Sequence, residues 1–491
     1  MIRRPQLKFL VGMFGSIQLG VTIVALALAP LFFGSVDQVW VTIWTILLSF
    51  GSLLGIAAPM GVAQTRILSA FLALCLIYAA VSMVQVAPHL IDRFNDPIWQ
   101  RAIDLLGIKS LPRISSRAEI PAISIGHFLL LVTSFVGGFF VGTSRRNGDI
   151  LIAVARYSIL AYAVYGLAAL VLTPDMLLWV PKHAYRGSLT ATFVNHNTAA
   201  TLLGVGTLLW FCSACLSLQS FHFSSFRFLL LAPSNEHIAF KVILRLAAGF
   251  TCFFALLLTG SRGGLICSCL GLLFAIGLML ANRLKAGVWY TLGSGSAALA
   301  VVVWWLSRTG RIGSQGFFDD GRWSVYSLCF EAIRQRPLLG AGAGTFADLF
   351  PSLRPEDFNS WGVWDYAHST ILEIAVEMGI PVAALIVIAA AASLFILARG
   401  ALKSKDRSRS SLAAIAGIAA LSYLHSMIDF SLQIPGYLIV FAILLGCGLA
   451  RSSLEQTTLY KARSRGFGKV RSQAGVVSAV KQQDTAKLPT F

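Results

Sequence analysis

Charged residues are scarce in this 491-residue sequence: Asp, Glu, Lys and Arg make up 12% of it, whereas a typical soluble domain contains about 25%. Acidic residues are the scarcer kind, with 21 Asp and Glu against 39 Lys and Arg, so the formal net charge is +18. Hydrophobic residues account for 56% of the chain. This composition excludes an ordinary soluble fold and predicts a membrane protein.

The sequence also lacks the patterns expected of nucleic-acid-binding proteins and of cysteine-based sites. Its basic residues are dispersed among short loops and the C-terminal tail, and no basic helix is interleaved with aromatic residues, so we expect no nucleic-acid partner. All but one of the eight cysteines lie in apolar runs, the exception being Cys329. We therefore expect neither a disulfide framework nor a zinc site.

Long apolar runs are abundant, and many reach the roughly 20 residues that a helix needs to cross a membrane. They predict an all-α polytopic membrane protein with about twelve transmembrane helices. The predicted spans are 9–33, 38–59, 66–86, 122–143, 150–173, 191–218, 241–260, 264–282, 288–307, 370–398, 411–428 and 436–450.

The distribution of basic residues predicts the orientation of these spans. If the N-terminus is cytoplasmic, every short basic loop falls inside, as the positive-inside rule requires. The larger segments 87–121, 174–190 and 308–369 then lie outside, together with the short turn that contains Arg262. We predict a multi-pass membrane protein with both termini cytoplasmic.

The same reading divides the chain into three parts. Residues 1–190 hold the first five spans and their outer loops, residues 191–450 hold the remaining spans and the large outer loop 308–369, and residues 451–491 form a polar tail. The tail is rich in Ser, Lys, Arg and Gln without apolar periodicity, so we expect it to be disordered and cytoplasmic.

The first outward-facing segment whose residues could bind or act on a substrate is Thr-Gly-Ser-Arg-Gly-Gly at 259–264. Its glycines would let the backbone approach a ligand closely, and the guanidinium of Arg262 offers a rigid fork of donors suited to phosphate. The alternative is a tight turn whose arginine reaches lipid phosphate.

The second element follows Asp319 and Asp320, where aromatic and aliphatic residues recur at helical spacing until Pro337; these are Trp323, Tyr326, Phe330 and Ile333. The pattern predicts an amphipathic helix that is capped by an aspartate and lies on the membrane or on the bundle. Arg322 would lie in its first turn, where a cation opposes the helix dipole unless it shares a bound anion with that terminus. The alternative is an exposed arginine beside an aromatic core stripe.

A glycine-rich run, Gly-Ala-Gly-Ala-Gly-Thr-Phe at 340–346, comes next. It follows no strand and belongs to no βαβ unit, so a dinucleotide loop is disfavoured. A backbone nest or a tight turn close to the membrane helices is the preferred interpretation.

The third element contains Trp361, Trp364, Asp365 and Tyr366, followed by His368. Thr370 and Glu373 have capping-box spacing, which predicts a span that begins there, with Glu373 and Glu377 on one face. Two interpretations of the aromatic residues are open: a membrane-interface belt or a platform for sugar rings. A structural role for the histidine at this helix entry is the alternative to a catalytic one.

Together these motifs resemble the bacterial O-antigen ligase/polymerase family. The similar segments are 259–264, 321–323, 340–346, 368–373 with 377–380, and Phe-Val-Asn-His-Asn at 193–197. They occur in the family's order and on one predicted face, and the resemblance covers roughly residues 185–450.

The resemblance implies a GT-C-type membrane fold and transfer of a glycan from an undecaprenyl-pyrophosphate carrier to an acceptor hydroxyl, of lipid A core or of another glycan, at the outer face of the inner membrane. By motif position, the functional arginines and histidine of the family correspond to Arg262, Arg322 and His368. Neighbouring residues are candidates for substrate binding: Asn195, His196, Asn197, Trp323, Tyr326, Trp364, Glu373 and Glu377.

The chemistry is consistent with these assignments. Breaking the bond between sugar and pyrophosphate builds negative charge on the leaving group, which guanidinium groups can stabilise. A histidine is a natural general base for the acceptor hydroxyl, and Glu373 or Glu377 could orient it. The outer segments show no acidic metal-binding cluster, so we expect a metal-independent, inverting enzyme without a cofactor, whose partners are its two substrates and membrane lipids.

Three other functions are alternatives to a ligase. A polymerase that extends glycan repeat units would use the same catalytic residues, so ligase and polymerase are nearly inseparable at this level. A secondary transporter would show broken helices at the membrane midplane and matched repeats, whereas the candidate residues here gather at one surface. A non-catalytic assembly protein is the remaining alternative.

Overall fold

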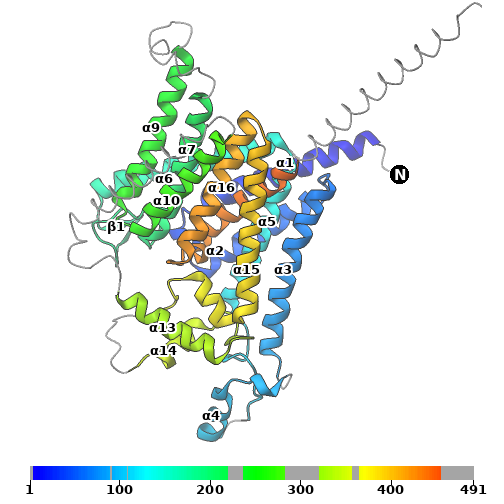
Figure 1. Ribbon diagram of the computed structural model, residues 1–491, viewed down its shortest axis with the longest axis vertical. Coiled ribbons are helices and arrows are strands. Elements are labelled where there is room, and N and C mark those ends of the chain that lie inside the picture. Colours follow the sequence, from blue (N-terminus) through cyan, green and yellow to red (C-terminus); the bar gives the residue numbers. More distant parts are fainter. Residues whose placement is uncertain are drawn as a thin grey trace, which may run out of the picture.

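The computed structural model describes residues 4–88, 91–107, 109–218, 236–281, 320–355 and 364–454. Within these ranges the protein is almost entirely helical (Figure 1), and the only strands are β1 (Met176–Leu177) and β2 (Val180–Pro181), which pair in antiparallel register. The all-α architecture predicted from the sequence is confirmed.

Nine helices in the described ranges are long and apolar enough to cross a membrane. They are α2 (Gln38–Gly55), α3 (Val62–Val86), α5 (Ala122–Gly142), α6 (Arg145–Leu172), α7 (His196–Leu218), α9 (Glu236–Leu258), α10 (Arg262–Leu280), α15 (Thr370–Lys403) and the final helix, Pro435–Leu454. The chain is thus a multi-pass membrane protein.

The other three predicted spans differ from these nine. The first corresponds to α1 (Arg4–Leu28), whose apolar part, Gly12–Leu28, is shorter. Another corresponds to α16 (Asp406–Ser426), which is rich in Ala, Ser and Gly and is mostly buried. The predicted span 288–307 lies outside the described residues. The total of twelve therefore stays a prediction.

Helix α16 lies in the middle of the bundle, packed against α7, α10 and α15. Small residues permit this close packing: a Cβ at Gly271 of α10 would come within 2.6 Å of the Gly417 carbonyl oxygen, and the reverse contact would be 2.5 Å. Because its neighbours cover it, α16 needs little lipid-facing apolar surface, which explains its modest hydropathy.

Helix α15 is broken near its start. Gly379 has φ 80° and ψ 167°, outside the helical region, and Pro381 follows two residues later. A Cβ at Gly379 would meet the Leu338 carbonyl oxygen at 2.4 Å, so only glycine fits here. The segment before the break carries Glu373 and Glu377.

One end of the molecule carries the short helices, η2 (Asp92–Phe94), α4 (Pro97–Leu106), α13 (Asp320–Gln335) and α14 (Phe346–Leu353). In Figure 1, α4, α13 and α14 lie beyond the ends of α3 and α15. Arg336 forms an ion pair with Asp96 (2.5 Å), and Arg117 forms one with Asp348 (2.7 Å). These bonds join segments that the sequence analysis assigns to the same side of the membrane.

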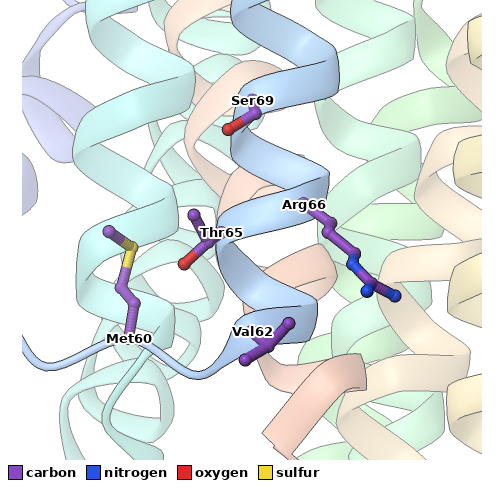
Figure 2. A pocket seen from close by; sticks show the side chains of 5 residues that line it. All are labelled: Met60, Val62, Thr65, Arg66 and Ser69. Atoms are coloured by element: carbon purple, nitrogen blue, oxygen red, sulfur yellow. The ribbon is translucent and has the colours of Figure 1, made fainter.

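The opposite end gathers segments with many basic residues. Arg451 and Arg407 approach the carboxylate of Asp149 at 2.6 and 3.3 Å, and Gln64 at the start of α3 donates to the carbonyl oxygen of Ala450 (3.2 Å). Beside this helix start lies an open pocket of about 410 Å³. Figure 2 shows its lining residues: Met60, Val62, Thr65, Arg66 and Ser69.

The main hydrophobic core runs between these two ends. It contains buried residues from α1, α2, α5 and α6 as well as from α7, α10, α15, α16 and the final helix. Residues before and after position 190 therefore share one core. The tail predicted over 451–491 begins later than expected, because residues 451–454 belong to the final helix and Arg451, Ser452 and Ser453 are buried. The rest of the predicted tail lies outside the described residues.

Candidate active site

The segment 259–264 forms a tight turn between α9 and α10. Gly260 has φ +73°, and the Ser261 side chain accepts a hydrogen bond from the amide of Gly264 (3.2 Å), which caps α10. Arg262 is consequently the first residue of α10, and its side chain is half-buried.

The glycines after Arg262 serve packing within the chain. A Cβ at Gly264 would lie 2.6 Å from the Cβ of Ala200, and a Cβ at Gly263 would lie 2.8 Å from Ile428 Cδ1. The sequence analysis expected a ligand to approach these glycines closely. Instead, Ala200 of α7 occupies the space beside Gly264, and Ile428, just after α16, occupies the space beside Gly263. Ile428 is fixed next to the arginine of α10.

Arg322 lies in the first turn of α13, as predicted, and its Nη1 donates to the carbonyl oxygen of Ile428 (3.0 Å). The side chains of Asp319 and Asp320 lie outside the described residues, so the predicted aspartate cap is not observed. Ile428 is therefore the common neighbour of the two helix starts that carry Arg262 and Arg322.

The buried face of α13 differs from the predicted stripe. Its core side is formed by Val325, Cys329, Ala332 and Ile333. Trp323 and Phe330 are 55% and 58% exposed, so the alternative of an aromatic core stripe does not hold for these two residues. The expected amphipathic helix on the membrane or on the bundle stays a prediction. The small residues pack closely against the chain, and the large aromatics face outward. Tyr326 is half-buried, and its ring meets that of Trp323 edge-on at 5.8 Å.

The glycine-rich loop 340–346 is a backbone nest, and Glu377 fills it. The Glu377 carboxylate accepts a hydrogen bond from the amide of Phe346 (3.0 Å), and the amides of Gly344 and Thr345 also bind it. Gly340 and Gly344 both have positive φ, which curls the loop around this carboxylate. The nest predicted from the sequence is confirmed, and its anion belongs to the chain itself.

His368 lies immediately before α15 in a strained conformation with φ 53°. Its carbonyl oxygen accepts a hydrogen bond from the Tyr326 hydroxyl (2.9 Å). Its ring packs edge-on against Trp364 and Phe430, with centroids 5.1 and 4.8 Å away. Both its backbone and its ring are therefore fixed by neighbours. Trp361 lies outside the described residues.

Glu373 supports the backbone next to His368. One carboxylate oxygen accepts from the amide of Ala367 (2.8 Å), and the other accepts from Gln433 (2.8 Å). The predicted capping box does not form, because Ser369 is the N-cap and the Thr370 hydroxyl donates to the Asp429 carbonyl oxygen (3.3 Å). The start of α15 at Thr370 is nevertheless as predicted.

The Asn-His-Asn sequence forms the start of α7. Nδ1 of His196 lies 2.8 Å from the Thr259 carbonyl oxygen, and its ring stacks on Tyr185 with centroids 4.2 Å apart. The Asn195 side chain accepts from the amide of Asn197 (2.7 Å), and the Asn197 side chain donates to Asp429 (2.7 Å). Here α7 meets the turn after α9.

The sequence analysis missed residues 425–433, here named the hub turn, which link α16 to the final helix. The Asp429 carboxylate, 1% exposed, also accepts from Ser431 (2.6 Å), and His425 Nδ1 lies 2.8 Å from the Thr201 hydroxyl. His425 and Asp429 are ionisable residues at the edge of the predicted span 411–428, and this could have marked them as functional. The same reasoning had identified Glu373 and Glu377.

The hub turn contacts the starts of α7, α10, α13 and α15. Arg322 and Thr370 donate hydrogen bonds to the carbonyl oxygens of Ile428 and Asp429. The ring of His368 packs on Phe430, and the Gln433 side chain donates to Glu373. Gly263, beside Arg262, packs against the same turn. Residues that are far apart in the chain are thus brought into one polar site.

Electrostatics place Tyr185 within this site. Burial raises the pKa of the Tyr185 hydroxyl, the Asp429 carboxylate raises it further, and Arg322 opposes both effects. Because these charges act on Tyr185, the site extends from the hub turn across to the loop before α7. The same two charges act on His196 and His425.

These elements define a polytopic helical membrane protein with a polar site of arginines and histidines at one end of the bundle. Residues 247–387 match the O-antigen ligase family model, so this region of the chain is similar to that family. The matched region includes Arg262, Arg322 and His368. No curated protein matches the chain. The family indicates a membrane protein that ligates or polymerises glycans.

Proposed function

We propose that the protein is a glycosyltransferase that moves a glycan from an undecaprenyl-pyrophosphate carrier to an acceptor hydroxyl at the periplasmic face of the bacterial inner membrane. One observation carries the proposal: Arg322 binds Ile428 while His368 packs on Phe430, two residues along the same hub turn. The hub turn thus contacts both the proposed cation and the proposed base. The site end is then periplasmic, and we propose a GT-C-type arrangement for the fold.

The arginines act on the leaving group. As the bond between the anomeric carbon and the pyrophosphate oxygen breaks, its electron pair and negative charge pass to that oxygen. Arg322 and Arg262 each lie in the first turn of a helix, α13 and α10, where helix dipoles also favour an anion. The two helix starts together offer guanidinium forks and positive dipole ends to one pyrophosphate.

His368 acts on the acceptor. Its imidazole takes the proton of the acceptor hydroxyl while the oxygen forms a bond to the anomeric carbon. Direct attack from the side opposite the pyrophosphate inverts that carbon. The reaction then balances without a metal ion: one C–O bond forms, one breaks, and the proton ends on the histidine.

The surrounding residues fall into two groups. Glu373 and Glu377 are positioning residues, because both carboxylates bind donors of the chain itself. Asn195 and Asn197 likewise tie α7 to the hub turn. Trp323, Tyr326, Trp364 and His196 present rings around the site and are the candidates for contact with sugar.

The break in α15 supports an enzyme over a secondary transporter. A transporter would use a broken helix to line a binding site at the membrane midplane. Here the gap at Gly379 is filled by Leu338 of the chain, close to the nest. The bent segment thus anchors the loop 340–346.

The test is reconstitution of purified protein with a lipid-pyrophosphate glycan and an acceptor, followed by gel analysis of the products. Appearance of glycosylated acceptor supports the proposal, and its absence with every donor and acceptor pair contradicts it. Comparing surface glycans of a null strain and its parent separates the variants: loss of the whole capped ladder indicates a ligase, and collapse to one repeat unit indicates a polymerase.

A further inference from the structure

Two arginines face each other between helices α6, α7 and α9, away from the candidate active site. Nη1 of Arg156 donates to the Ser213 hydroxyl (2.6 Å), and Nη1 of Arg245 donates to the Ser213 carbonyl oxygen (3.1 Å) and to the Ser217 hydroxyl. Both side chains are half-buried. One stretch of α7 thus holds both guanidinium groups.

The pair lies near the end of the bundle that carries Asp149. Ser410, in the first turns of α16, donates to the carbonyl oxygen of Cys212 (2.9 Å), so the adjacent Ser213 is level with the start of α16. Arg407, at that helix start, acts electrostatically on Arg156. The arginines therefore lie at the height where a membrane helix enters the headgroup region, opposite the active-site end.

Within the described ranges, neither Arg156 nor Arg245 has a carboxylate partner; their hydrogen bonds go to serine oxygens. The carboxylate of Asp149, two turns before Arg156 on α6, is bound by Arg407 and Arg451. Arg156 and Arg245 thus lie near a carboxylate that two other arginines already bind. Neutral hydroxyls do not offset the cost of holding unpaired cations at a membrane interface.

The surroundings open toward lipid. The guanidinium carbon of Arg156 lies 4.7 Å from the centre of the Trp210 ring and 5.4 Å from that of Tyr157. Tyr157 is 59% exposed, and Phe250, one turn after Arg245, is 58% exposed. Nε of Arg156 is buried without a hydrogen-bond partner among the described residues. Amphipathic rings beside cations are typical of a membrane interface.

We propose that Arg156 and Arg245 bind the phosphate of an anionic phospholipid, in the leaflet opposite the candidate active site. A phosphate diester supplies the missing negative charge and accepts several N–H donors from two planar forks at once. Basic pockets between membrane helices are suited to such headgroups. This site is independent of the proposed glycosyl transfer.

The test uses full-length protein in neutral detergent and measures the midpoint of thermal unfolding with added phosphatidylglycerol or phosphatidylcholine. Phosphatidylglycerol should raise the midpoint of the wild-type protein, and phosphatidylcholine should not. The double variant Arg156→Gln/Arg245→Gln should lose this shift. Arg146→Gln is the matched control, because Arg146 is an exposed arginine at the start of α6 and should leave the shift unchanged.

Two further arms keep the outcome decisive. If the double variant does not fold, Arg245→Lys keeps the charge but loses the fork, and should raise the phosphatidylglycerol concentration for half-maximal shift by about tenfold. Inorganic phosphate should not reproduce the shift. Equal shifts in wild type and variants, no response to phosphatidylglycerol, or equal stabilisation by inorganic phosphate would each overturn the lipid site.

Discussion

The hydroxyl of Tyr326 donates a hydrogen bond of 2.9 Å to the carbonyl oxygen of His368. Tyr326 is one turn along α13 from Arg322, so this bond couples the helix that carries the proposed anion-binding arginine to the backbone of the proposed base. The two proposed catalytic groups are therefore linked through the hydroxyl of Tyr326.

Tyr326→Phe should lower kcat and leave stability almost unchanged. Loss of a neutral hydrogen bond costs about 0.5–1.5 kcal/mol, which corresponds to roughly a two- to tenfold loss in rate if it is expressed in the positioning of His368. Steady-state kinetics with the reconstituted protein measure this effect. Tyr157→Phe, a remote and exposed tyrosine, is the control and should behave as wild type. An unchanged kcat in Tyr326→Phe argues against the positioning role.

Arg322→Ala should reduce glycan transfer by about 10²–10³-fold, the loss expected when one stabilising donor to a developing anion is removed. Arg322→Lys should recover only part of the rate, because a point charge does not reproduce a planar fork. Both proteins should accumulate normally in the membrane. Arg334→Ala changes an exposed arginine of the same helix, paired with Glu331, and should keep full activity. Full activity in Arg322→Ala would contradict the proposal that Arg322 stabilises the pyrophosphate leaving group.

The nest around Glu377 makes a prediction about stability. A Cβ at Gly340, which has φ +64°, would lie 2.3 Å from the carbonyl oxygen of Glu377, so Gly340→Ala forces the backbone apart. Gly107 has a similar φ of +62° with nothing within 4 Å of the added Cβ. Gly107→Ala should therefore show only conformational strain of about 1 kcal/mol. Thermal unfolding in detergent should show the larger loss for Gly340→Ala, and equal losses would contradict the packing argument.

A histidine base and arginine electrophiles predict how the reaction responds to pH and to chelators. The base works only in its neutral form, so the rate should fall as the pH falls through the range where imidazole becomes protonated. Activity should persist in excess EDTA. His368→Ala should lose turnover yet still bind the lipid-pyrophosphate donor, because the arginines remain. Loss of activity in EDTA with recovery on adding magnesium or manganese would refute the metal-independent mechanism.

Orientation can be tested with single exposed cysteines. Ser352→Cys, on α14, should react with an impermeant thiol reagent added to intact cells with a permeabilised outer membrane, while Lys405→Cys, at the opposite end, should react only after lysis. The parent protein shows the background, and its Cys329 is fully buried. The reverse labelling pattern would place the candidate site in the cytoplasm.

Local patterns allowed much of this arrangement to be predicted from the sequence. Apolar run length identified the membrane helices, and Pro337 correctly marked the end of α13 shortly after Gln335. Periodicity identified the apolar residues of α13 but could not distinguish the side that packs against the chain from the side that faces outward. The capping box at Thr370 failed because a tertiary partner, the Asp429 carbonyl oxygen, takes its hydroxyl.

The hub turn escaped prediction for a different reason. Its function arises from long-range contacts, such as Asn197 with Asp429, which are 232 residues apart. The pair His425 and Asp429 at the edge of a predicted span gave a signal, but the sequence alone did not show which distant segments it contacts. The glycine-rich loop shows the intermediate case: its nest geometry followed from composition, but the identity of its anion, Glu377, required the tertiary structure.

The break at Gly379 also bears on where the hydrocarbon begins. A straight helix of 34 residues would be about 51 Å long, well beyond the roughly 30 Å of a bilayer core. The part from Ile380 to Lys403 alone is about 36 Å, which is sufficient to cross. The break at Gly379 therefore separates a segment long enough to cross the bilayer from the segment that carries Glu373 and Glu377. Glu373 and Glu377 can then remain on the aqueous side, although a hydropathy plot assigns them to a membrane helix.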